Sequence, residues 1–191
     1  MKKYELTEET VTVYGKTLYR IRAVRDFGSV KTGEFGGYIE KEENLSRFGN
    51  AWVSDNAWVF DNARVYDNAW VFGDAWVSGN ARVSDNARVF GNAWVYGDAR
   101  VSGNAWAYGN AEVFNTRHFF VQGPIGSRDG YVTFYRTKDD TVEVRCGCFS
   151  GSLQEFVNQV EETHGGSRYE KEYKLAAELA KVCIRLEGES R

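Results

Sequence analysis

A strict six-residue period fills the middle of this 191-residue chain. From Asn50 to Asn115 the sequence consists of eleven consecutive hexads without an insertion, beginning NAWVSD, NAWVFD, NARVYD. The second position is Ala in every hexad, and the fourth is Val in every hexad except the one that contains Ala107. Such a period indicates a stack of similar small units, each of which depends on its neighbours for burial.

The hexad also shows which side chains are buried. Side chains of a strand alternate between its two faces, so the second and fourth positions share one face and the third and fifth share the other. The third position is Trp, Arg or Glu. Because unpaired charges are not buried, the Ala and Val face must be the inner one. Asn, Asp and Gly at the first and sixth positions tolerate the positive φ of tight corners.

This pattern resembles the hexapeptide-repeat family, whose fold is a left-handed parallel β-helix. The resemblance implies three hexads per triangular coil, so that every eighteenth residue stacks. We therefore expect a mainly β protein with three parts: an N-terminal hairpin and cap (1–49), a hexapeptide-repeat β-helix (50–115) and a small C-terminal domain (116–191). Caps are needed because both ends of such a helix expose unpaired edges.

Stacking predicts three columns of outward side chains. The columns are Trp52, Trp70, Arg88 and Trp106; Trp58, Trp76, Trp94 and Glu112; and Arg64, Arg82 and Arg100. We expect Arg88 to lie between the rings of Trp70 and Trp106 in a double cation–π contact. The arginine column requires compensation, either by Asp67 and Asp85 at the corners or by a bound anion.

Outward indoles and aromatic fifth positions predict larger apolar patches than a monomer usually exposes. We expect self-association through the tryptophan faces, and trimers are common in the family that the repeat resembles. Two alternatives stay open. The rings stabilise neighbouring coils only by stacking, or they hold a ligand such as a glycan or a nucleic-acid base.

The segment before the repeat reads as a β-hairpin that turns at Gly15, followed by a degenerate first coil from Gly36 to Gly49. Its Gly36-Gly37-Tyr38-Ile39 and Asn44-Leu45-Ser46 motifs resemble the opening of uncharacterised hexapeptide-repeat proteins of bacteria and phages, which are often labelled as acyltransferases.

After Asn115 the period stops. Three strands (118–125, 130–137 and 141–149) and two helices are expected, which gives a βββαα domain of the α+β class. The first helix starts at Ser152, with Glu155 completing a capping box, and ends near His164; the second spans about 169–186.

The tail resembles a small domain of phage-encoded repeat proteins through GPIGSR (123–128), GCFSG (147–151) and ETHG (162–165), which implies a phage or prophage origin. A glycine-rich loop that ends in Ser127 and Arg128 offers amides, a hydroxyl and a cation to an anion. The start of the first helix, with Ser150 and Ser152, also favours an anion. Together with His164 these are the candidate ligand-binding residues; ordinary turns and helix caps are the alternative.

Catalytic signatures are weak. Hexapeptide acyltransferases usually use a coil histidine as a base, whereas residues 44–115 contain none and only His118 follows the repeat. Cys146 and Cys148, alternating on one strand face, are expected to be buried thiols, with a metal site as the alternative. Without a Walker, Rossmann or Ser–His–Asp motif, we expect neither a cofactor nor a metal.

A net charge of −3 makes general nucleic-acid binding unexpected. The sequence shows neither an apolar span nor a secretory signal, and its three cysteines do not suggest a disulfide framework, so we expect a cytoplasmic protein, in the host cell if a phage encodes it.

The hypothesis is an oligomeric, non-enzymatic binding protein in counter-defence, which binds a host factor or sequesters a nucleotide signalling molecule. An acyltransferase and a structural protein of a phage particle are the alternatives.

Overall fold

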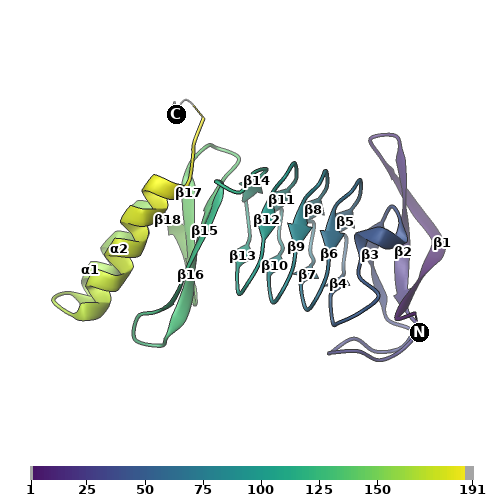
Figure 1. The fold of residues 1–191 in the computed structure, drawn as a ribbon, viewed down its shortest axis with the longest axis horizontal. Helices are drawn as coiled ribbons and strands as arrows, with labels where there is room; N and C mark the ends of the chain where they lie inside the picture. The colour runs from purple at the N-terminus through teal and green to yellow at the C-terminus, as the bar shows by residue number, and fades with distance from the viewer. Residues whose placement is uncertain (1, 188–191) are drawn as a thin grey trace.

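The computed structural model describes residues 2–187, which form a row of three parts. Figure 1 shows an N-terminal β-hairpin, a β-solenoid, and a C-terminal sheet backed by two helices. The last positions of the expected 116–191 domain, 188–191, lie outside the described residues. No helix in the described part is long and apolar enough to cross a membrane.

The solenoid consists of two-residue parallel strands, one per hexad. They are β4 (Trp52–Val53), β5 (Trp58–Val59), β6 (Arg64–Val65), β7 (Trp70–Val71), β8 (Trp76–Val77), β9 (Arg82–Val83), β10 (Arg88–Val89), β11 (Trp94–Val95), β12 (Arg100–Val101), β13 (Trp106–Ala107) and β14 (Glu112–Val113). Trp52 pairs with Trp70, and Trp58 with Trp76, so each coil has 18 residues. The three faces and about four coils agree with the predicted columns.

The solenoid core is made of Ala and Val alone over most of its length. Every Ala and Val at the second and fourth hexad positions is 0% exposed. The corners take positive φ, as at Asp61 (60°) and Gly79 (65°). Stacked coils are joined at these corners, because the Asp61 carboxylate accepts a hydrogen bond from the backbone N–H of Gly79 at 3.1 Å. The corners therefore hold coils together as well as turning the chain.

The N-terminal segment closes one end of the solenoid. Strands β1 (Tyr4–Val13), β2 (Lys16–Ala23) and β3 (Phe35–Ile39) extend one solenoid sheet to seven strands. A 3₁₀ turn, η1 (Glu42–Asn44), follows. Tyr38 pairs with Trp58 and Leu45 with Val65, so the first coil is the degenerate one that the sequence predicts, with a step of 20 residues.

The C-terminal part has one strand more than predicted. Its antiparallel sheet contains β15 (Phe119–Ile125), β16 (Gly130–Arg136), β17 (Val142–Cys146) and β18 (Phe149–Ser152), and helices α1 (Leu153–His164) and α2 (Arg168–Cys183) follow. The expected strand 141–149 is wrong because a turn with Gly147 at φ 58° folds it into a hairpin. The domain is therefore ββββαα, and its second helix ends earlier than expected.

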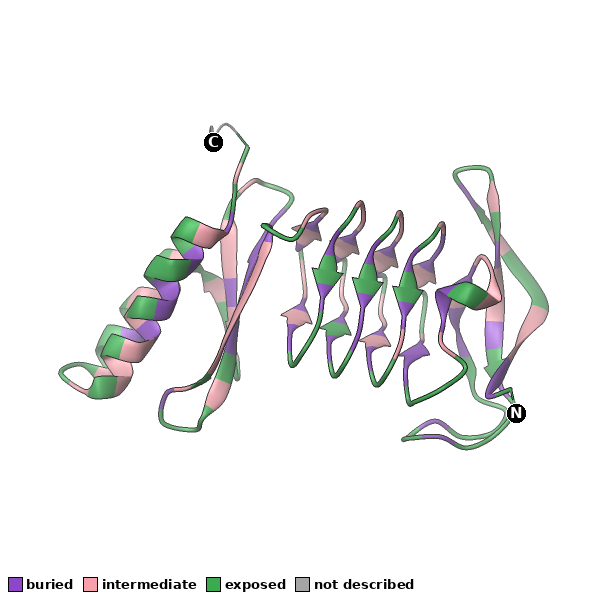
Figure 2. Cartoon of the chain, in the orientation of Figure 1, coloured by how far each residue is buried: buried purple, intermediate pink, exposed green. Residues whose placement is uncertain are grey.

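This sheet lies between the solenoid and the helices (Figure 1). Tyr135 belongs to the solenoid core and is 0% exposed, whereas its neighbour Phe134 packs with Phe156 and Tyr173 of the helices. Alternation along β16 thus gives the sheet one face for each neighbour. Figure 2 shows the corresponding buried residues on the helix side that faces the sheet. The C-terminal sheet is the cap that closes the second end of the solenoid.

Candidate functional site

A cleft of about 850 Å³ lies where the solenoid meets the C-terminal domain. Its walls come from the last solenoid coil, the β15–β16 and β17–β18 turns of the C-terminal sheet and the facing sides of α1 and α2. Thr133 and Arg145 share one face of the sheet, whereas Cys146 lies on the other. The cleft therefore passes the ends of β16 and β17, from the solenoid side to the helix side.

The β15–β16 turn brings Ser127 and Arg128 to the cleft, as the sequence suggested. The turn is tied to α2, because Glu172 accepts a hydrogen bond from the backbone N–H of Gly126 at 2.7 Å. Gly126 has φ 76°, and a Cβ there would overlap the Tyr173 side chain. The loop that carries Arg128 is therefore anchored at its first residue.

The solenoid side of the cleft contains Trp106 between two guanidinium groups. Arg88 of the preceding coil lies 5.3 Å from the ring centroid and Arg145 of β17 lies 5.4 Å from it. Since β13 is the last strand of its sheet, the two arginines reach Trp106 from opposite directions. Arg145 also lies over Tyr108 at 5.5 Å, and its Nε is buried without a partner among the described residues.

The helix side of the cleft is more apolar. His164, the last residue of α1, packs against Tyr173 with 5.6 Å between ring centroids. Burial raises the pKa of Tyr173 to about 12, so its hydroxyl is protonated at neutral pH. Phe156 and Tyr173 pack edge to face at the base. These rings, with the side-chain amide of Gln159 and the hydroxyl of Thr163, offer a flat ligand apolar contact and hydrogen bonds.

The two cysteines of the cleft differ from the prediction. Cys146 is the last residue of β17, and burial raises the pKa of its thiol. Cys148 lies in the following turn and is exposed. They are not a buried pair on one strand face, because the chain reverses between them. No cluster of three or more His, Cys, Asp or Glu suited to a metal occurs within residues 2–187.

The charge of the cleft is one-sided. Its described lining residues include Arg128 and Arg145, and none of them is Asp or Glu. The whole chain, by contrast, has a net charge of −3. The potential in the cleft therefore favours an anion, and its partly closed, apolar walls strengthen that attraction.

Two predicted ligand-binding residues lie elsewhere. Ser152 caps α1, and the Glu155 carboxylate accepts hydrogen bonds from its backbone N–H and its hydroxyl, both at 2.8 Å. Ser150 lies on β18 beside Glu155 and Glu162, at a second and smaller hollow. At this helix start a carboxylate of the chain itself already accepts the hydrogen bonds that Ser152 can donate.

His118 is part of the joint between solenoid and cap and does not line the cleft. It is 4% exposed, and its ring packs edge-on against Phe114 with 4.0 Å between centroids. Burial, with the nearby Arg136 guanidinium, lowers the pKa of His118 to about 4. A buried imidazole that takes up a proton so reluctantly is poorly placed to act as an acyltransferase base.

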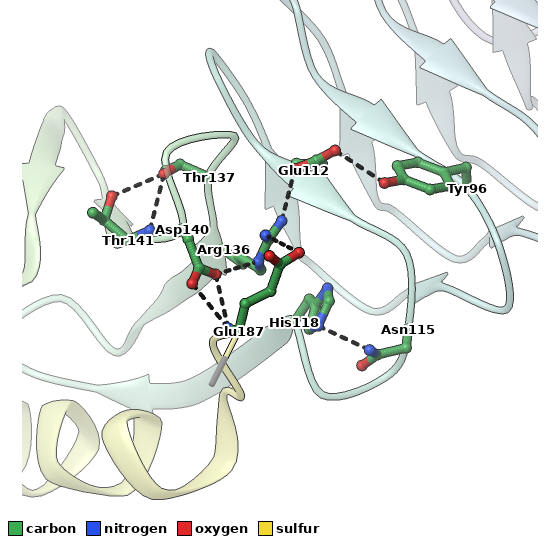
Figure 3. Close-up of polar contacts among 9 residues, drawn as sticks. All are labelled: Tyr96, Glu112, Asn115, His118, Arg136, Thr137, Asp140, Thr141 and Glu187. Atoms are coloured by element: carbon green, nitrogen blue, oxygen red, sulfur yellow. Dashed lines mark hydrogen bonds and ion pairs between the residues drawn. The ribbon is translucent and has the colours of Figure 1, made fainter. Parts of the chain in front are cut away.

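The same joint contains a buried arginine (Figure 3). Arg136 is 4% exposed in its side chain and pairs with Glu112 of the last coil and with Asp140, both at 2.7 Å. Glu112 in turn accepts a hydrogen bond from the hydroxyl of Tyr96 at 2.9 Å. These contacts fix the C-terminal sheet on the solenoid and hold the cleft walls in place.

The tryptophan columns are less exposed than predicted. Trp52 is 1% exposed because Tyr4 and Phe27 cover it. Trp76 stacks between Trp58 at 4.7 Å and Trp94 at 5.2 Å. Arg88 lies over one ring, that of Trp106, among the described residues, and the expected second contact with Trp70 is absent. Stacking and the caps thus cover much of the indole surface.

Sequence reasoning missed the contribution of the solenoid to the cleft. Asn104 and Trp106 line it together with Tyr131 of β16. The column alignment places Trp106 in the last coil, next to the cap, and that position was the available signal. Nothing in the sequence indicates that Arg145 packs over the ring of Trp106.

Comparison with known proteins identifies the repeat but not the cleft. Residues 63–79, 81–97 and 93–109 match the family model described as the YdcK beta solenoid repeat. The matched segments cover less than half of the chain and contain none of the cleft residues of the C-terminal domain. No curated protein matches the chain.

Proposed function

We propose that this chain is a non-enzymatic binding protein whose cleft takes a small anionic ligand with a flat ring, of the nucleotide class. The observation that carries the proposal is the composition of the cleft. It combines two arginines with several aromatic rings, and its described lining residues include no acid. Its volume of about 850 Å³ is in the range of small-molecule sites.

Each part of such a ligand has a partner in the cleft. Arg128 and the Ser127 hydroxyl suit a phosphate, which accepts charge-assisted hydrogen bonds. Tyr131, which is exposed, suits a stacked base, because every base has a π face. Gln159 and Thr163 suit the polar edge of the ring. None of these groups is an activated base or nucleophile, which favours binding over turnover.

The biological setting that we propose is counter-defence, in which a phage or prophage protein sequesters a nucleotide signalling molecule of its host. The resemblance of the tail to phage-encoded repeat proteins supports this setting. Binding of a host protein is a second candidate, favoured by an exposed apolar stripe on α2: Leu175 (70%), Leu179 (46%) and Val182 (81%). We also propose a homo-oligomer, most simply a trimer, formed through the tryptophan faces.

Titration calorimetry against cyclic di- and trinucleotides and ADP-ribose derivatives tests the proposal. We expect heat with at least one of them and a loss of about tenfold or more in affinity in Arg128→Gln, since a charge-assisted hydrogen bond contributes about 1.5–3 kcal/mol. Arg25→Gln, an exposed arginine of the N-terminal loop, is the matched control. If none of these compounds gives heat, the small-ligand function is wrong and host-protein binding is left.

A further inference from the structure

The third face of the solenoid carries a column of arginines. Arg64, Arg82 and Arg100 occupy equivalent positions on β6, β9 and β12 and pair in register. Stacked strands lie about 4.8 Å apart, so the arginine column is about 10 Å long. All three residues are exposed, and Figure 2 shows these strands in green on the face toward the viewer.

The arginine column has no ion-pair partner among the described residues. Within residues 2–187 none of its three guanidinium groups forms an ion pair. The corner carboxylates Asp67 and Asp85, expected from the sequence to offset the charge, bind the backbone of the next coil. Asp67 accepts a hydrogen bond from the backbone N–H of Asp85, and Asp85 accepts one from that of Gly103 at 2.9 Å. These carboxylates join coils and form no ion pair with the arginine column, whose three guanidinium groups are free to contact an anion.

The arginine column leads to the cleft. A ladder of side-chain amides runs along the adjacent corner, from Asn68 to Asn86 at 3.4 Å and from Asn86 to Asn104 at 3.3 Å. Asn104 lines the cleft, and it follows Arg100 by four residues in the same coil. The positive row and the positive cleft therefore meet at one corner of the last coil.

Aromatic rings lie at both ends of this path. Tyr66 follows Arg64 by two positions, so the two side chains share the outer face of the first arginine coil, and Tyr66 is half-buried. Tyr131 is at the cleft end and is exposed. A positively charged track with rings for stacking is how proteins bind single-stranded nucleic acid without reading its sequence. An acidic peptide would use the arginines but not the rings.

We infer that the cleft ligand is the terminal nucleotide of a short single-stranded oligonucleotide, whose backbone phosphates lie along Arg64, Arg82 and Arg100. This inference rests on the proposed function, because the terminal nucleotide occupies the cleft. Three cations on a chain of net charge −3 cannot hold a long polyanion, so short chains are the expected ligands.

Binding of thymidine monophosphate and of labelled oligothymidylates of increasing length, measured by fluorescence anisotropy and competition at low salt, tests the inference. We expect affinity to rise with length until the arginine column is spanned. Arg82→Gln should lower oligonucleotide affinity about two- to fivefold and reduce the salt slope by about 0.7, without changing binding of the monophosphate. Arg25→Gln is the matched control for a lost exposed charge.

The outcomes separate the two proposals. If the monophosphate binds and added length brings no gain, the arginine column has no part in binding, and the proposed function stands. If no thymidine nucleotide of any length binds, the inference is wrong, and the calorimetric panel alone decides the proposed function. Equal losses in Arg82→Gln and Arg25→Gln, or equal binding of polyglutamate of matched charge, would also overturn the inference. Because Arg82 is exposed, its substitution is expected to leave the thermal unfolding temperature unchanged, which circular dichroism verifies.

Discussion

Arg145 of the C-terminal sheet lies over the ring of Trp106 in the last solenoid coil, 5.4 Å from its centroid. The contact joins two parts of the chain that the sequence pattern treats as separate. It places a cation and an indole on one wall of the cleft, which neither part could form alone. The cap that closes the solenoid is therefore also what creates its candidate binding site.

The solenoid geometry can be tested with two matched glycines. Gly79 and Gly103 occupy the same hexad position with φ 65° and 69°. A Cβ on Gly79 would lie 2.8 Å from the backbone N of Gly97 in the next coil, whereas one on Gly103 meets nothing within 4 Å. Gly103→Ala should lower the free energy of unfolding, measured with urea, by about 1–2 kcal/mol because of the backbone conformation at this position. Gly79→Ala should lower it clearly more. Equal costs would show that the coils are not stacked this closely.

The joint between solenoid and cap is expected to depend on Arg136. Arg136→Met removes a buried cation from Glu112 and Asp140 and should destabilise the protein by about 3 kcal/mol, since breaking a buried pair leaves charges without a partner. Glu187→Gln changes only the exposed partner, 75% exposed, and should have no measurable effect. Chemical denaturation measures both. If Arg136→Met leaves the free energy of unfolding unchanged, the contact between the solenoid and the C-terminal sheet does not depend on these ion pairs.

Acid sensitivity is expected from His118. Its folded pKa of about 4 lies below its ordinary value of 6.5, so the unfolded chain takes up a proton first as the pH falls. The resulting stability is fully present above pH 6.5 and is lost between 6.5 and 4, by up to about 3 kcal/mol. His118→Phe removes this group. The difference in unfolding free energy between the two proteins should therefore change over that range; parallel pH profiles would contradict the assigned burial.

Self-association is expected to use the tryptophan faces. Light scattering should give a mass above the 21.7 kDa of one chain, and Trp76→Gln, in the middle of its column, should reduce it. Leu179→Gln on the apolar stripe of α2 is the matched control. If the wild-type protein has the mass of a monomer, the proposed self-association is wrong. Dissociation by Leu179→Gln alone would move the interface to α2.

The repeat could be read from the sequence because its period fixes geometry directly. Ala and Val alternate with charged positions, so the inner face follows from strand alternation, whereas the three columns follow from the three hexads per coil that the family resemblance implies. The turn at Gly147 was missed because Val144, Cys146 and Cys148 continue one alternating pattern across it, which is typical of a single strand. The burial of Trp52 could not be predicted, because Tyr4 and Phe27, which pack against its ring, come from distant segments of the chain.

The candidate site was only half predictable. Ser127 and Arg128 were recognisable as a polar loop next to glycine, and the structure places them at the cleft. Ser150 and Ser152 have the same residue chemistry, but Glu155 already binds the amide and the hydroxyl at that helix start. Trp106 and Arg145 come from different parts of the fold, and only their packing brings them together.

The most direct measurement is a crystal structure of the protein with the tightest-binding nucleotide of the calorimetric panel. We expect ligand density in the cleft, with a phosphate against Arg128 and the base beside Tyr131. A nucleotide held elsewhere on the molecule, or a cleft left empty at saturating ligand, would contradict it.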